Sequence, residues 1–284
     1  MAQDAKPNWR GMDAATRAKA YSPSSVLAQG DLTPFIQRYI ERSAQVYDAN
    51  DVQTLVYGGQ PANTIDIILP AVRDAPLHAF VHGGYWQELS KCESMFPATD
   101  TLAHNMGFAA IDYTLAPNAS LDEIIKECCA AISCLFENAA LLGFDRDRIV
   151  LSGSSAGAHL AAMACLRLPQ SYRPKGVILM SGIYELEPLI GTYINAPLGL
   201  NVETAKRNSP VLADLSNFPP SVIAWGAIET DEFKRQSRMF HDRLRRAGAR
   251  SEMLEVDGRN HFDIVEEIAS DSTLGRALAT LAET

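Results

Sequence analysis

Residues 149–160 read IVLSGSSAGAHL, an apolar β-branched run that ends abruptly in Gly-Ser-Ser-Ala-Gly. Small residues suited to a helix follow at 161–164. A strand, a tight turn and a helix around G-x-S-x-G are typical of a nucleophile elbow, whose central serine has a strained backbone. Gly153 and Gly157 fit because a Cβ at either position would collide with the neighbouring strand or helix. Ser155 is therefore the candidate nucleophile, at the positive end of the following helix.

Strand-like and helix-like patterns alternate along most of the chain. Strands are expected at residues 52–57, 64–69, 77–81, 108–111, 149–152, 176–180, 221–225 and 252–256. Helices are expected at residues 31–49, 95–105, 121–138, 232–247, 263–269 and 273–282. This alternation predicts an α/β fold with a mostly parallel sheet and helices on both faces. The first two strands are joined through Gly58-Gly59, a hairpin signal, and would form an antiparallel edge.

The chain reads as a single domain of 284 residues without internal repeats or linkers. Residues 1–30 are polar and rich in Pro and Ser, and we expect an irregular arm on the surface. Residues 181–218 have weak periodicity and several Pro, Gly and Tyr residues, which favours a lid or cap insertion.

Composition narrows the classes of function. The net charge of −9, from 25 basic and 34 acidic residues, argues against a nucleic-acid partner or an anionic membrane surface. The sequence has neither the apolar core of a secretory signal nor a membrane-length apolar run. Five cysteines without disulfide-like spacing favour free thiols and a cytoplasmic location. No metal-ligand spacing or H-E-x-x-H motif is present, so we expect no metal and no cofactor.

A serine hydroxyl needs a base to become an effective nucleophile. Two histidines follow the expected lid. His241 lies in a charge-rich helical stretch, where a solvated side chain is the simpler interpretation. His261 lies in DGRNHF, directly after the last expected strand, and is the candidate base.

Three carboxylates follow the expected strand at 221–225 and compete for the role of triad acid. Glu229 is nearest to the strand end and is favoured. Asp231 stays open as an alternative, although its position also suits a helix N-cap. Glu232 falls at the start of the expected helix. The acid would fix the imidazole tautomer and stabilise the imidazolium that forms during attack.

The segment His82-Gly83-Gly84 directly follows the expected strand at 77–81. Glycines there would let backbone N–H groups approach a substrate. Together with the N–H of Ala156, those of Gly83 and Gly84 are the candidate oxyanion hole. His82 is interpreted as a structural hydrogen-bonding residue rather than a base.

Aromatic residues near these motifs are candidates for substrate binding. Tyr85 and Trp86 directly follow the glycines, and an aromatic wall suits a flat aryl substrate. Tyr184 and Tyr193 lie in the expected lid, where pocket contact and ordinary packing are equally open. We select Tyr85, Trp86 and Tyr184 as the candidate substrate-binding residues.

These motifs together resemble the α/β-hydrolase superfamily. HGGYW at 82–86 looks like the corresponding string of the serine-dependent kynurenine formamidases (arylformamidases). SSAGAHL at 154–160, EFKRQS at 232–237 and HF at 261–262 are also similar to that family. DYTLAP at 112–117 resembles a stretch of the hormone-sensitive-lipase-type esterases.

The resemblance spans roughly residues 64–261. It implies an α/β-hydrolase fold and cleavage of an aryl formamide or small aryl amide by a Ser-His-Glu triad through an acyl-enzyme. The animal formamidases have Asp where Glu229 stands, but a glutamate can orient the histidine equally well.

Two other functions compete with this one. A carboxylesterase or aryl acylamidase would use the same residues on small esters or anilides. A non-catalytic binding protein on the same fold is disfavoured because Ser155, His261 and a nearby acid are all present. The expected partner is a small-molecule substrate, and the sequence leaves open whether the chain forms a homodimer.

Overall fold

The computed structural model describes residues 9–269 and 271–283. Within these residues, eight strands form one sheet in the order β1-β2-β4-β3-β5-β6-β7-β8. Strand β2 is antiparallel to β1 and β4, and the other neighbouring pairs are parallel. The predicted parallel sheet with an antiparallel hairpin at its edge is confirmed. The strands are β1 (Gln53–Val56), β2 (Thr64–Ile68), β3 (Ala75–Val81), β4 (Gly107–Ile111), β5 (Phe144–Ser154), β6 (Gly176–Met180), β7 (Ser221–Ile228) and β8 (Ser251–Asn260).

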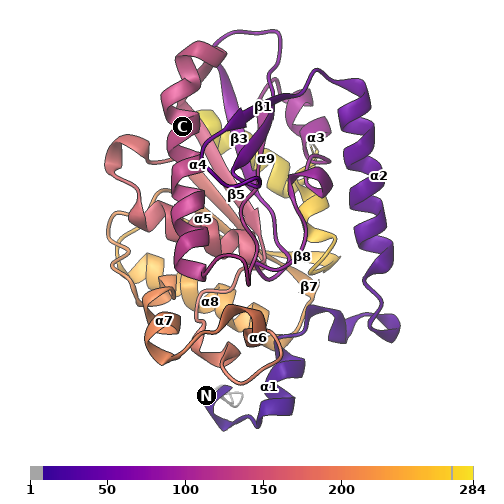
Figure 1. The fold of residues 1–284 in the computed structure, drawn as a ribbon, viewed down its shortest axis with the longest axis vertical. Coiled ribbons are helices and arrows are strands. Elements are labelled where there is room, and N and C mark those ends of the chain that lie inside the picture. Colours follow the sequence, from indigo (N-terminus) through magenta and orange to yellow (C-terminus); the bar gives the residue numbers. More distant parts are fainter. Residues whose placement is uncertain (1–8, 270, 284) are drawn as a thin grey trace.

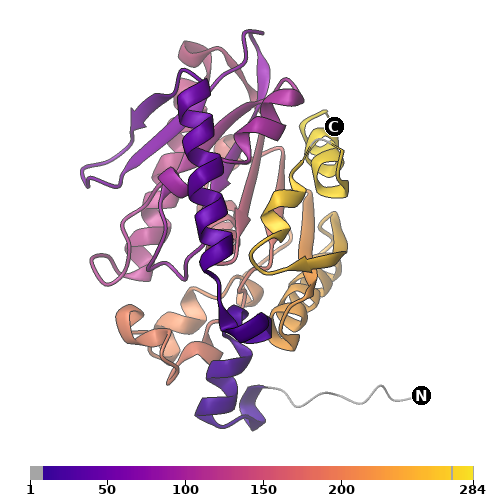
Figure 2. The ribbon, with the colours of Figure 1, turned by 90° about the vertical axis from the view of Figure 1, so that its right-hand side faces the viewer.

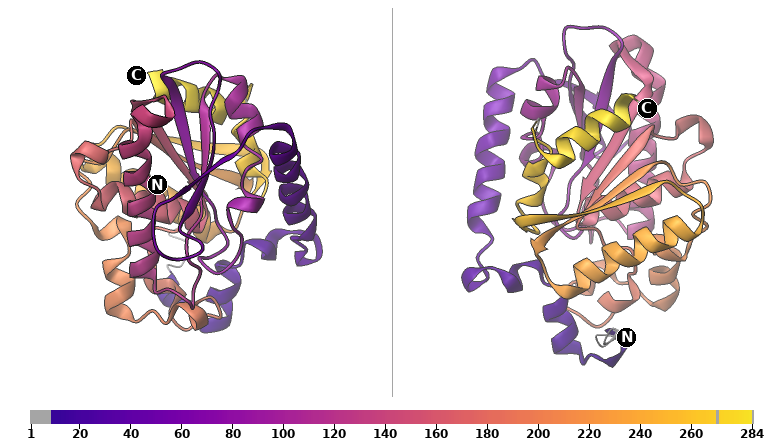
Figure 3. Two further views of the ribbon diagram at one scale, coloured as in Figure 1. Left: turned by 45° about the horizontal axis from the view of Figure 1, so that its top comes forward. Right: turned by 180° about the vertical axis from the view of Figure 1, so that it is seen from behind.

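Helices cover both faces of the sheet (Figure 1). Helices α4, α5 and α8 contribute to the core on one face, and α2 and α9 to the core on the other. The view from behind shows α9 crossing that second face (Figure 3). The helices are α1 (Ala14–Ala20), α2 (Thr33–Ala49), α3 (Ala98–Ala103), α4 (Leu121–Leu142), α5 (Ala156–Arg167), α6 (Asn195–Leu198), α7 (Val202–Arg207), α8 (Asp231–Arg246) and α9 (Thr273–Glu283).

Successive residues of a central strand pack in two separate hydrophobic cores, one on each face of the sheet. In β6, Val177 and Leu179 pack in the core that contains α4 and α5, whereas Ile178 and Met180 pack in the core that contains α9. Side chains on a strand alternate between the two faces of the sheet. A strand buried on both faces therefore needs apolar residues at every position, which explains the continuous apolar runs in the sequence.

The parallel strands bring distant residues to one edge of the sheet. His82 follows β3, Ser155 follows β5, Ser181 follows β6, Glu229 follows β7 and His261 follows β8. In parallel α/β sheets, ligands bind outside these carboxyl ends. The topology thus gathers the sequence candidates at the edge where such folds carry their sites.

The N-terminal segment differs from the irregular arm that we expected. Residues 9–30 contain α1 and three short 3₁₀ turns, and residues 1–8 of the expected arm lie outside the described residues. Asp13 caps α1 by accepting a hydrogen bond of 2.7 Å from the Thr16 N–H. This segment lies below α2 in Figure 2. The helix expected at 263–269 is also wrong, because only a 3₁₀ turn forms there, at Ile264–Glu267.

Candidate active site

The turn between β5 and α5 has the geometry that a nucleophile elbow requires. Ser155 has φ 57° and ψ −118°, a region that residues with a side chain rarely adopt. A Cβ on Gly157 would lie 2.0 Å from the Val81 carbonyl oxygen, and one on Gly153 would lie 2.3 Å from the Gly157 carbonyl oxygen. The predicted steric need for both glycines is confirmed. The Ser155 N–H donates to the Met180 carbonyl over 2.8 Å and secures the turn to β6.

His261 and Glu229 meet beside this turn. Nδ1 of His261 lies 3.1 Å from Oε2 of Glu229. The other carboxylate oxygen, Oε1, accepts hydrogen bonds of 2.6 Å from the Ser181 hydroxyl and of 2.6 Å from the Gly226 N–H. The Glu229 side chain has 0% exposed surface. Buried and held by three contacts, this carboxylate orients the His261 ring through Nδ1 and leaves Nε2 on the opposite side of the ring.

The two alternative acids occupy different places. Glu229 lies within hydrogen-bond distance of His261, and Asp231 is exposed in the first turn of α8. Glu232 is buried and accepts a hydrogen bond of 2.7 Å from the Tyr21 hydroxyl. The geometry therefore favours Glu229 over Asp231 as the partner of His261.

The loop after β3 approaches the elbow closely. A Cβ on Gly83 would lie 3.0 Å from the Ser154 carbonyl oxygen, and Gly84 has φ +91°. The Tyr113 hydroxyl donates to the carbonyls of His82 and Gly83 over 3.1 and 3.2 Å. The His82 ring stacks on the Tyr113 ring with centroids 4.2 Å apart, and burial raises the pKa of Tyr113 well above its ordinary value. Tyr113 thus stays a neutral donor that shapes this loop.

His82 has the structural position expected from the sequence. Its Nδ1 lies 3.0 Å from the Gly83 carbonyl oxygen, and the side chain is buried. Ala156 is the first residue of α5, so its N–H has no acceptor within the helix. Gly83 lies close to Ser155, because a Cβ on Gly83 would be 3.3 Å from the Ser155 Cβ, and Ala156 directly follows Ser155.

A cavity of about 280 Å³ lies at this edge, and Ser155 and His261 both line it. Its other walls come from residues 22–24, from α2, from the loop after β3, and from Tyr193 and Ile194. The lining is mainly apolar and aromatic, as is typical of small-molecule sites.

Of the three aromatic candidates for substrate binding, Tyr85 lines the cavity and the other two do not. Trp86 is fully buried and packs edge-on against His159 of α5, with ring centroids 5.0 Å apart. Tyr184 is also fully buried and stacks on Phe240 of α8, with centroids 4.2 Å apart. The prediction for Trp86 and Tyr184 is wrong because helices that are distant in sequence cover both rings.

Several cavity residues were missed from the sequence. Residues 22–24, Leu32 at the N-cap of α2, and Ile36 and Tyr39 within α2 reach the site only through tertiary packing, and no motif marks them. Ser181 had one usable signal, since it directly follows a predicted parallel strand and so had to lie at the same edge as Ser155.

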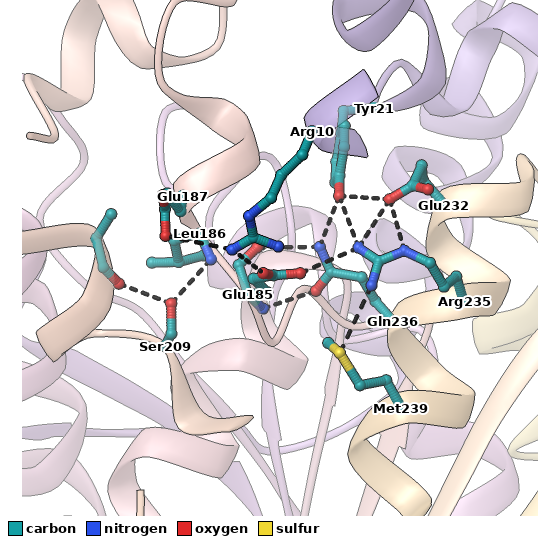
Figure 4. A network of polar contacts seen from close by, with 11 residues as sticks. Arg10, Tyr21, Glu185, Leu186, Glu187, Ser209, Glu232, Arg235, Gln236 and Met239 are labelled. Atoms are coloured by element: carbon teal, nitrogen blue, oxygen red, sulfur yellow. Dashed lines mark hydrogen bonds and ion pairs between the residues drawn. The ribbon is translucent and has the colours of Figure 1, made fainter. Parts of the chain in front are cut away.

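A polar network joins three segments of the chain (Figure 4). Arg235 of α8 contacts the carboxylates of Glu232 and Glu185, at 2.8 and 3.1 Å. The Gln236 side chain accepts from the N–H of Glu185 over 2.7 Å and donates to the Tyr21 hydroxyl over 3.1 Å. The network connects α8 with the 181–218 segment and with the N-terminal segment.

The described part of the chain offers neither a cluster of metal ligands nor a membrane-spanning helix. Among the described residues, no group of three or more His, Cys, Asp or Glu side chains gathers as a metal site would require. No helix formed by residues 9–269 and 271–283 has the length and apolarity needed to cross a membrane.

Comparison with known proteins gives relatives along most of the chain. A family model described as the alpha/beta hydrolase fold matches residues 78–263. Kynurenine formamidase of Danio rerio is 30% identical, over 94% of this chain and 95% of that protein. Kynurenine formamidase of Drosophila melanogaster is 30% identical, over 78% of this chain and 79% of that protein. An isoprenylcysteine α-carbonyl methylesterase of Arabidopsis thaliana is 27% identical, over 75% of this chain and 56% of that protein.

Solved structures share the fold at lower identity. A putative thioesterase from a Silicibacter species superposes with a TM-score of 0.83 at 23% identity, covering 92% of this chain and 97% of that one. The thermostable carboxylesterase EstE1, cloned from a metagenomic library, has a TM-score of 0.69 at 21% identity, covering 87% of this chain and 93% of that one.

Proposed function

Because this chain belongs to the α/β-hydrolase family and is a hydrolase, we propose that it cleaves an aryl formamide or a related small aryl amide. The observation that carries the proposal is the meeting of the strained Ser155 turn with the His261–Glu229 pair at one cavity. The names of the relatives that match along most of the chain support the choice of an aryl formamide such as N-formylkynurenine.

In the proposed first step, Ser155 Oγ attacks the formyl carbonyl while Nε2 of His261 takes the hydroxyl proton. Glu229 stabilises the imidazolium through Nδ1. The developing oxyanion accepts hydrogen bonds from the backbone N–H groups of Gly83, Gly84 and Ala156, in a site whose donors need no reorganisation.

In the second step the tetrahedral intermediate collapses. The carbon–nitrogen bond breaks, His261 gives its proton to the leaving aniline nitrogen, and a formyl ester of Ser155 remains. Water then attacks this ester while His261 takes its proton, His261 returns that proton to Ser155 Oγ as the ester bond breaks, and formic acid is released. The net reaction consumes one water and yields an arylamine and formic acid.

Hydrolysis of N-formylkynurenine and of formanilide by the purified protein tests this proposal. We expect turnover that falls to the background rate in Ser155→Ala. If the protein hydrolyses neither compound, or if Ser155→Ala hydrolyses them as fast as the wild type, the aryl formamide proposal is wrong.

A second candidate uses the same residues on small carboxylic esters or anilides. The mainly apolar lining of the cavity and the methylesterase among the relatives favour it. Specificity constants for short-chain p-nitrophenyl esters and for formanilide, measured side by side, decide between the two functions. An ester preference that persists with unactivated alkyl esters would favour the second candidate, because activated esters react easily.

A further inference from the structure

The N-terminal segment forms one wall of the cavity that holds Ser155. Ser22, Pro23 and Ser24 line this cavity together with Ser155 and His261. These three residues directly follow Tyr21, the C-cap residue of α1. The family match begins at residue 78, so these three residues lie outside it.

Tyr21 is held from several sides although its segment lies near the start of the chain. Only 1% of the residue is exposed. Its hydroxyl donates to Oε2 of Glu232 over 2.7 Å and accepts from Nε2 of Gln236 over 3.1 Å (Figure 4). Its carbonyl oxygen accepts a hydrogen bond of 2.5 Å from the hydroxyl of Tyr85, which also lines the cavity.

The neighbouring residue is tied to the same region. The Thr230 hydroxyl donates to the Ala20 carbonyl over 2.6 Å, and Thr230 directly follows Glu229. The Tyr21 ring also lies 6.4 Å from the ring of Phe233, whose centroid is 4.4 Å from that of His261. The anchors of this segment therefore lie on α8 and in the two loops that carry Glu229 and the Gly83-Gly84 pair.

We propose that Tyr21 is a positioning residue that fixes residues 22–24 as a preformed wall for the aryl part of the substrate. This inference rests on the proposed function of the site. A fixed wall needs no ordering when substrate binds, so the binding of a substrate that reaches it is stronger. A substrate with a small leaving group does not reach the wall and gains nothing from it.

Two formyl compounds separate these cases. Formanilide and ethyl formate would give the same formyl ester on Ser155 and differ only in the leaving group. In Tyr21→Phe the ring remains and the hydroxyl is lost, so we expect KM for formanilide to rise about three- to tenfold, the effect of about one buried hydrogen bond. We expect kcat for formanilide, and both constants for ethyl formate, to stay within about twofold.

Two further variants keep the test independent of general stability. Thr230→Val removes the hydroxyl that holds Ala20, and because Thr230 makes no side-chain cap bond for α8 it should change KM in the same direction. Tyr47→Phe removes a comparable hydrogen bond of 2.7 Å to Asp66, away from the cavity. It should leave the ratio of KM for formanilide to KM for ethyl formate unchanged.

The outcomes separate the inference from the function. Suppose that the wild type cleaves both compounds through Ser155. If Tyr21→Phe and Thr230→Val leave the ratio of KM for formanilide to KM for ethyl formate unchanged, the inference is wrong and the function stands. The same holds if the two variants lower kcat equally for both compounds. If the wild type cleaves neither compound, the proposed function fails and the inference fails with it.

Discussion

The backbone of Ser155 is strained because a residue with a Cβ occupies an unfavourable conformation there. Its φ of 57° and ψ of −118° cost about 1–3 kcal/mol for a residue with a Cβ, and glycine avoids most of this cost. Ser155→Ala and Ser155→Gly should both lose activity. Ser155→Gly should be more stable than Ser155→Ala by about 1 kcal/mol, because the relief of strain exceeds the extra chain entropy of glycine. Urea unfolding of the two variants measures the difference, and a less stable glycine variant would contradict it.

Glu229 and Asp231 differ in what they can do for His261. Glu229→Gln replaces the buried carboxylate with an amide, which favours the wrong imidazole tautomer and no longer stabilises the imidazolium. We expect kcat for formanilide to fall by about 10³–10⁴-fold. Asp231→Asn, in the exposed first turn of α8, is the matched control and should change kcat by less than about twofold. The opposite ranking of the two variants in steady-state kinetics would assign the acid to Asp231.

At the scale of elements, the packing of α5 against β3 depends on one missing side chain. A Cβ on Gly157 would lie 2.0 Å from the Val81 carbonyl, and backbone cannot move aside cheaply. Gly157→Ala should lower the free energy of unfolding by more than about 3 kcal/mol. Gly59→Ala, where a Cβ meets nothing within 4 Å, should change it by less than about 1 kcal/mol. Denaturant unfolding of both variants checks the contrast, and equal losses would contradict it.

The elements that the sequence predicted well are those whose pattern follows from burial. The strand expected at 176–180 forms over Gly176–Met180, because a central strand is apolar on both faces. β8 runs on to Asn260, beyond the 252–256 expected. It pairs with β7 alone, so its polar residues remain exposed and give no strand signal. Short turns such as Ile264–Glu267 depend on local contacts rather than on periodicity.

For the whole molecule, two buried histidines make stability depend on pH. Burial lowers the pKa of His159 to about 4 and that of His78 to about 3, below the ordinary 6.5. Between the lowered pKa values and 6.5, the unfolded chain therefore binds more protons than the folded chain. The free energy of unfolding consequently falls as the pH drops below about 6.5. For His159, the loss between pH 7.5 and 5.0 is about 2 kcal/mol.

His159→Gln isolates this contribution. Glutamine can still donate to the Asn208 carbonyl, which Nε2 of His159 contacts at 2.7 Å, but it does not titrate. Between pH 7.5 and 5.0, the free energy of unfolding of the variant, measured with urea, should fall by about 2 kcal/mol less than that of the wild type. Burial lowers the pKa of His241 on α8 as well, but this side chain is only half-buried, so His241→Gln should change the pH dependence of stability less than His159→Gln does. If the free energy of unfolding of His159→Gln changed with pH as steeply as that of the wild type, His159 would not be the source of this pH dependence.

The whole molecule also explains which site residues could be predicted. Ser155, His261 and Glu229 each follow a strand, so chain order and parallel topology were enough to bring them to one edge. Trp86, Tyr184 and residues 22–24 could not be assigned in this way. Their burial or exposure to the cavity depends on how α1, α5 and α8 pack, which local sequence does not specify.

Labelling with a fluorophosphonate probe, followed by peptide mass spectrometry, tests most directly whether His261 activates Ser155. We expect one adduct, on the peptide that contains Ser155, which is absent from Ser155→Ala and forms far more slowly in His261→Gln. An adduct on another residue, or labelling of Ser155 at an unchanged rate in His261→Gln, would contradict it.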